Sequence, residues 1–149
     1  MKQAKMTKFI ATADADRKWY VVDAKDQILG RLATKVARII RGKEKAAFSP
    51  NADTGDFVVV INADQVKVTG KRESLKTYVH YSGYPGGLKT KSYQELKKNN
   101  AEYIIESAVK GMLPKTRLGN QLIKKLKVYP GENHPHQAQK PELISLSEK

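Results

Sequence analysis

The residues most suggestive of chemistry lie between positions 107 and 131, in a stretch that has many cations and no carboxylate. Its basic residues are Lys110, Lys115, Arg117, Lys124, Lys125 and Lys127. A helix face that simply meets solvent normally mixes both signs of charge. Lysine and arginine side chains supply many of the contacts that proteins make with nucleic-acid phosphates. The pattern therefore favours a phosphate-binding surface over an ordinary solvated one.

A second basic group lies at residues 31–45. Its members are Arg31, Lys35, Arg38, Arg41, Lys43 and Lys45. The first three have the i, i+4, i+7 spacing that places side chains on one face of a helix. Three cations on an exposed helix face are common in ordinary proteins. Even with the charge that follows, this region supports nucleic-acid contact and plain solvation about equally.

The third candidate is a glycine-rich loop. Its residues are Ser82, Gly83, Tyr84, Gly86 and Gly87, with His80, Tyr81 and Lys89 on either side. Glycine allows a backbone to approach a phosphate closely, and a tyrosine ring can stack on an unpaired base. A connecting loop with a packed tyrosine would explain the same residues equally well.

The sequence has few of the residue patterns typical of metal sites or of enzyme active sites. His134 and His136 are too few for a zinc site, which normally has three or four protein ligands, and there is no cysteine. These histidines are expected to contact RNA or solvent. A dinucleotide-binding fingerprint would need three glycines where only Gly30 stands. Asp53 and Asp56 lie in a turn-rich loop and are predicted to form Asx turns. We therefore expect no enzyme, no metal, no cofactor and no small-molecule substrate.

The elements that would position these residues begin with a strand–helix–strand unit. Residues 19–22 are aromatic and β-branched, as in a buried strand. Residues 29–41 have an amphipathic helical pattern that ends at Gly42. Residues 57–61 form an unbroken apolar run, typical of a strand buried on both faces of a parallel sheet. This order predicts a right-handed βαβ crossover and an α/β fold.

The remainder predicts smaller elements. The sequence predicts a third strand at residues 77–81 and a last one at 128–129. A capping box at 92–95 starts a short helix, a second helix spans 101–112, and a third short helix spans about 118–126. Three parts are expected: a mobile basic arm at 1–17, a single domain at 18–131, and a polar tail at 132–149.

Composition narrows the class of partner. The 149 residues include 28 Lys and Arg against 15 Asp and Glu, a formal net charge of +13. Such a charge opposes compaction unless a polyanion neutralises it. No apolar run approaches the ~20 residues that span a membrane, and the apolar run after the basic start is too short for a secretory signal. The sequence predicts a cytoplasmic protein that binds nucleic acid.

Ten short motifs together resemble one family, that of the thirteenth protein of the bacterial large ribosomal subunit. They are KWYVVDA at 18–24, LGRLA at 29–33, DTGD at 53–56, VINA at 60–63, TGK at 69–71, SGYPGG at 82–87, AVKGMLP at 108–114, LG at 118–119, KLKVY at 125–129 and HPHQAQKP at 134–141. Family members often have a basic residue and then histidine before the Ser-Gly or Thr-Gly pair. Here the order is His80-Tyr81-Ser82, which leaves open which side chain contacts RNA.

The resemblance implies a three-layer α/β/α domain on a small, mostly parallel, four-stranded sheet. It also implies a structural protein that binds large-subunit ribosomal RNA, acts early in subunit assembly and contacts neighbouring large-subunit proteins. The alternative is a free-standing RNA-binding regulator of messenger RNA. The predicted RNA contacts are the two basic groups and the glycine-rich loop with its flanking residues, together with Lys71, Arg72, His134, His136 and Lys140.

Overall fold

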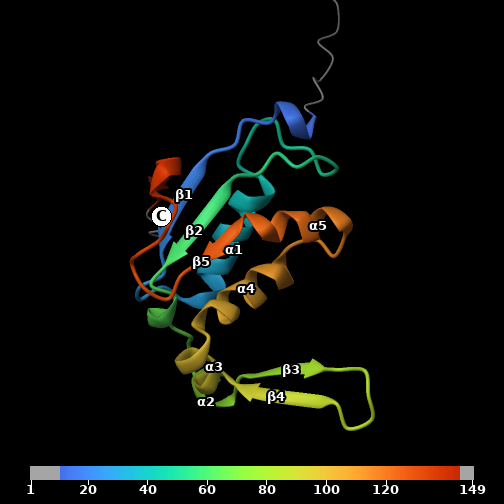
Figure 1. Cartoon of the computed structure of the whole chain (residues 1–149), viewed down its shortest axis with the longest axis vertical. Helices are drawn as coiled ribbons and strands as arrows, with labels where there is room; N and C mark the ends of the chain where they lie inside the picture. The colour runs from blue at the N-terminus through green and yellow to red at the C-terminus, as the bar shows by residue number, and fades with distance from the viewer. Residues whose placement is uncertain (1–10, 145–149) are drawn as a thin grey trace, which may run out of the picture.

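The centre of the protein is a four-stranded sheet, seen in a computed structural model that describes residues 11–144 (Figure 1). Its strands are β1 (Trp19–Asp23), β2 (Phe57–Ile61), β5 (Leu126–Val128) and β6 (Glu142–Leu143), in the order β5-β2-β1-β6. All three strand pairs are parallel. The α/β class and the parallel sheet predicted from the sequence are confirmed.

The strand–helix–strand unit forms as predicted. Helix α1 (Leu29–Arg41) follows β1 and places Leu32, Val36 and Ile40 in the interior. Gly42 ends the helix in the left-handed conformation at φ 78°, and its N–H donates to the carbonyls of Arg38 and Ile39. A glycine adopts this conformation without the steric penalty that a side chain would bring.

One face of the sheet carries the main hydrophobic core. It is contributed by Val22, Val58, Val60, Leu126 and Val128, and it packs against helices α1 and α4 (Ala101–Met112). These two helices also contact each other (Figure 1). Shorter helices α3 (Tyr93–Asn99) and α5 (Arg117–Leu122) flank α4 in the chain. A 3-10 turn (Ile123–Lys125) joins α5 to β5. The last predicted strand, at 128–129, therefore begins two residues earlier and ends one residue earlier than expected.

The opposite face is covered by the chain that follows β5. Trp19 and Phe57 stack on this face with ring centroids 4.5 Å apart, and His136 packs on Trp19 at 5.2 Å. A 3-10 helix (Gln137–Gln139) then leads into β6, which pairs with β1. The second helical layer of this three-layer α/β/α fold is thus a single short turn. β6 lies in the segment for which the sequence predicted only a polar tail.

A two-stranded hairpin projects from the body of the domain (Figure 1). Its strands are β3 (Thr77–Tyr81) and β4 (Leu88–Ser92), which pair antiparallel, and the short helix α2 (Arg72–Leu75) precedes them. The predicted third strand is therefore real but belongs to a separate sheet. Residues 1–10 of the expected basic arm lie outside the described residues. Residues 12–14 form a 3-10 helix that lies close to the loop before β2, where the hydroxyl of Thr12 accepts from the N–H of Asp53.

Candidate nucleic-acid interface

The acid-free stretch at 107–131 places most of its cations on the surface. Lys110 is on α4, Lys115 precedes α5, Arg117 begins α5, and Lys124 lies in the 3-10 turn after it; all four are exposed. Thr116 caps α5 by accepting a hydrogen bond from the N–H of Gly119. The local structure thus holds these long side chains outward, where phosphates could reach them.

Lys125 is the exception, and the expectation that it is an exposed RNA contact is wrong. Its side chain is only 6% exposed and forms an ion pair with Asp53. Its ammonium also donates to the carbonyl of Gly55 at 2.8 Å and lies 5.5 Å from the centre of the Phe57 ring. Burial lowers the pKa of Lys125 from its ordinary value, and the hydrogen bond to Asp53 opposes that shift. Lys125 therefore stabilises the interior.

The two aspartates of the loop before β2 are likewise structural, though not as predicted. Asp53 binds Lys125 and lies 3.8 Å from Arg17. Asp56 accepts from the backbone N–H of Lys18 at 2.8 Å and from the ammonium of Lys45 at 2.6 Å. These partners are distant in sequence, whereas an Asx turn is a contact within two residues. The Asx-turn prediction is therefore wrong at both positions.

The cations of residues 31–45 are less available than their number suggests. Lys45 is held by Asp56 and by the carbonyl of Asp16 at 2.5 Å. Arg38 lies 3.9 Å from Glu44, with both side chains more than half exposed. Arg41 is half-buried over the ring of Phe48. Arg31 and Lys43 are exposed, and Lys35 is half-buried. This group keeps a basic character, but Arg38, Arg41 and Lys45 all contact other residues.

The two basic regions meet on one side of the domain. The side chain of Met112, at the end of α4, reaches Thr34 on α1. A shallow pocket of about 150 Å³ opens there, and Arg38, Arg41 and Lys43 line it with Met112. Lys115 and Arg117 follow shortly after Met112 in the chain. Met112 thus brings the end of α4 beside the cations at the end of α1. We refer to the cations of these two segments together as the α1–α4 surface: Arg38, Arg41, Lys43, Lys110, Lys115 and Arg117.

The hairpin loop is a tight, hydrogen-bonded turn. The N–H of Ser82 donates to the carbonyl of Gly87 at 3.1 Å, and that of Gly87 donates to Tyr84 at 2.9 Å. Gly83 and Gly86 have φ values of 90° and 72°, which side chains rarely adopt. Tyr84 is 75% exposed. The tyrosine at the tip is therefore not packed, which removes the plain alternative of a loop built around a buried tyrosine.

The register of the hairpin separates its two faces. His80 pairs with Lys89 and Tyr78 with Lys91, so these four side chains share one face. Tyr81 pairs with Leu88 on the other face, where both are largely exposed. Lys91 and Tyr103 were not among the predicted contacts. The alternation of Lys89 and Lys91 along a strand was the available signal for Lys91; only the fold brings Tyr103 of α4 near the hairpin.

The remaining predicted contacts are scattered. Lys71, Arg72 and Lys140 are exposed. His136 is held by Trp19 and by a 2.9 Å hydrogen bond with the hydroxyl of Tyr129, and burial lowers its pKa. His134 accepts from the N–H of His136 at 3.2 Å. His136 thus packs on the sheet, with His134 beside it.

Residues 11–144 lack the features of two other classes of site. Nowhere in this part of the chain do three or more His, Cys, Asp or Glu side chains gather as a metal would require. None of its helices has the length and apolar character needed to cross a membrane.

The fold and its basic surfaces define a small α/β protein with the charge of a nucleic-acid-binding protein. Residues 17–135 match the family model described as ribosomal protein L13, so the chain belongs to the ribosomal protein L13 family.

Curated relatives with similar sequences support the same family. The large ribosomal subunit protein uL13 of Crocosphaera subtropica is 58% identical over 144 residues, 95% of each chain. That of Synechococcus elongatus is 60% identical over 131 residues, 88% of this chain and 87% of the relative. The same protein of Syntrophomonas wolfei is 58% identical over 134 residues, 90% and 93%.

Proposed function

We propose that this protein is a structural constituent of the large ribosomal subunit in the cytoplasm, where it binds large-subunit ribosomal RNA and neighbouring large-subunit proteins and helps early subunit assembly. One observation carries the RNA-binding part. Lys110, Lys115, Arg117 and Lys124 are exposed within a stretch that has no carboxylate. Because the chain belongs to a ribosomal protein family, the RNA that this surface would contact is that of the ribosome.

Mechanistically, the protein acts as an electrostatic clamp. The rigid sheet and the α1–α4 pair hold the α1–α4 surface in a fixed arrangement, and its cations neutralise phosphates of separate RNA segments. Each neutralised phosphate releases condensed counterions, so the affinity falls as salt rises. The hairpin extends this reach beyond the body of the domain. No step of this function requires a catalytic group.

Sedimentation of a cell lysate tests the proposal directly. The chain should migrate with the large subunit and with its earliest precursor particles, and it should remain there in moderate salt. A chain found mostly in the soluble fraction, bound to messenger RNA, would overturn the proposal and support a regulator instead.

A further inference from the structure

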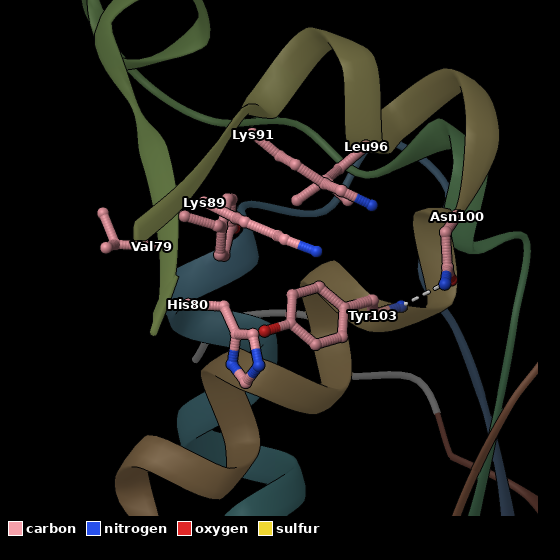
Figure 2. A pocket seen from close by; sticks show the side chains of 8 residues that line it. Val79, His80, Lys89, Lys91, Leu96, Asn100 and Tyr103 are labelled. Carbon is pink, nitrogen blue, oxygen red and sulfur yellow. Dashed lines mark hydrogen bonds between the residues drawn. The ribbon is translucent and has the colours of Figure 1, made fainter. Parts of the chain in front are cut away.

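A pocket lies where the hairpin meets the helical layer. Its volume is about 320 Å³, within the range of about 300–1,000 Å³ typical of small-ligand sites. The hairpin contributes Tyr78, His80, Lys89 and Lys91, while Leu96 and Asn100 come from α3 and its end and Tyr103 from α4. Figure 2 shows Lys89 and Lys91 reaching from β4 toward the beginning of α4, where Asn100 and Tyr103 lie.

The charge of this pocket is uniformly basic. Its lining contains His80, Lys89 and Lys91 and no Asp or Glu. Neither lysine forms an ion pair with a carboxylate of residues 11–144. Cations that converge in a concave site repel one another until an anion enters. The pocket is therefore suited to a phosphate-bearing ligand.

An aromatic ring and an amide lie beside the cations. Tyr103 is 41% exposed, and the ring of Tyr78 holds it edge-on at 6.0 Å. The Asn100 side-chain oxygen accepts from the backbone N–H of Tyr103 at 3.1 Å, which orients its amide nitrogen as a donor. Burial raises the pKa of Tyr78 to about 12, so its hydroxyl stays neutral and brings no negative charge.

We propose that this pocket binds one unpaired RNA nucleotide, with the base against the ring of Tyr103 and the adjoining phosphates at Lys89 and Lys91. The inference rests on the proposed RNA-binding function and names a subsite within it. An exposed ring, an amide donor and two lysines match a base with its two flanking phosphates. A phosphorylated peptide would use the lysines but leave the ring and the amide without a planar partner.

The test uses the full chain and two probes: a mixed-sequence single-stranded RNA hexamer and the same sequence as a duplex. Tyr103→Leu replaces the aromatic ring with a smaller apolar side chain, and Tyr103→Phe retains the ring. We expect Tyr103→Leu to weaken hexamer binding by between about 5- and 150-fold, as loss of one base–aromatic stack does, and Tyr103→Phe to bind like the wild type. The duplex, whose bases are already stacked, should be much less affected.

Two double variants with the same loss of charge distinguish binding in the pocket from general electrostatic attraction of RNA. Lys89→Gln with Lys91→Gln should weaken hexamer binding more than Lys97→Gln with Lys98→Gln, since the latter lysines of α3 lie outside the pocket. A hexamer carrying 4-thiouridine should crosslink to peptides within residues 78–103. Crosslinks confined to other peptides would overturn the inference, even if Tyr103→Leu failed to fold.

The outcomes also separate the two proposals. If Tyr103→Leu binds the hexamer as well as the wild type does while a large-subunit RNA fragment still binds, the proposal that the pocket binds a nucleotide is wrong. The proposed RNA-binding function is then unaffected. Binding of the hexamer and of the duplex could depend equally on Lys89 and Lys91, with neither depending on Tyr103. The site then contacts phosphates only, and the proposed binding of an unpaired base is wrong. If the wild type binds no RNA, both proposals fail.

Discussion

Lys124 and Lys125 are neighbours in the chain with opposite surroundings. Lys124 is exposed, whereas Lys125 is buried against Asp53 and Gly55. Sequence alone makes them equivalent, because both follow the short apolar pattern of α5 and no local signal marks the inward one. The partner that distinguishes them lies in the loop before β2, and only the pairing of β5 with β2 brings the two together.

Replacement of Lys125 should therefore reduce stability. Lys125→Met leaves the carboxylate of Asp53 buried with only the more distant Arg17, and we expect a loss of about 3–5 kcal/mol in the free energy of unfolding. Lys124→Met is the matched control and should change it by less than about 0.5 kcal/mol. Urea unfolding of both variants measures the difference. Equal values would show that the Lys125–Asp53 pair contributes nothing.

The raised pKa of Tyr78 predicts how the stability of the fold changes with pH. Its hydroxyl is buried without a hydrogen-bond partner in the described part of the chain, and burial raises its pKa to about 12. In the unfolded chain it would ionise near pH 10. The stability that the neutral hydroxyl supports is thus fully present below pH 10 and is lost as pH rises toward 12.

The Tyr78→Phe variant should accordingly lose less stability than the wild type as the pH rises above 10. Near pH 7 it should be neutral or stabilising by about 1 kcal/mol, because it removes an unsatisfied polar group. Tyr84→Phe, at the exposed tip of the hairpin, is the control and should follow the wild type. Thermal unfolding between pH 7 and 11 measures both variants. A Tyr78→Phe protein that loses stability with pH as steeply as the wild type would contradict the assignment.

At the scale of elements, His136 covers the face of the sheet opposite the main core, and β6 covers the outer edge of β1. A chain ending at Gly131 should lose the packing of His136 on Trp19 and the pairing of β6 with β1. We expect a loss of at least about 2 kcal/mol, together with a red shift in the emission of Trp19, the single tryptophan. A chain ending at Ile144 retains both features and is the matched control. Unchanged stability of the shorter chain would show that this cover is dispensable.

The elements also show what the sequence could and could not predict. Helices α1 and α4 were correctly predicted with their bounds, because each has an amphipathic stripe and a clear end. Ser92 caps α3 through the N–H of Glu95, as the capping box predicted. β6 was missed because two residues have no periodicity. β4 was missed because its five exposed residues show no apolar alternation. Its pairing partner β3, not its own sequence, makes it a strand.

At the scale of the whole molecule, the two basic regions can be ranked. Replacing Lys110, Lys115, Arg117 and Lys124 with glutamine should weaken RNA binding more than replacing Arg31, Lys35, Arg38 and Arg41. In the second set, Arg38 is near Glu44 and Arg41 is half-buried over Phe48. If each lost cation had neutralised one phosphate, the log–log salt slope of the first variant would become shallower by roughly three, at ~0.7 per phosphate.

Binding of a large-subunit RNA fragment across a salt series measures this ranking. Circular dichroism is the control for folding, which the first variant should keep because all four of its replaced residues are exposed. Equal losses from the two sets would mean that neither dominates the interface. The acid-free stretch was visible in the sequence. Its junction with α1 was not, because that depends on how α1 and α4 pack together.

The strand order has a consequence for how the chain is made. β1 is the first strand of the sheet to be synthesised, yet its outer edge is covered by β6, which is the last. At about 5–20 residues per second, the interval between them lasts on the order of ten seconds. Throughout that interval a nascent chain presents an unpaired strand edge, which is a template for pairing with another chain. Final closure of the sheet must therefore await the synthesis of β6, so the nascent chain is the form that most needs protection from association with other chains.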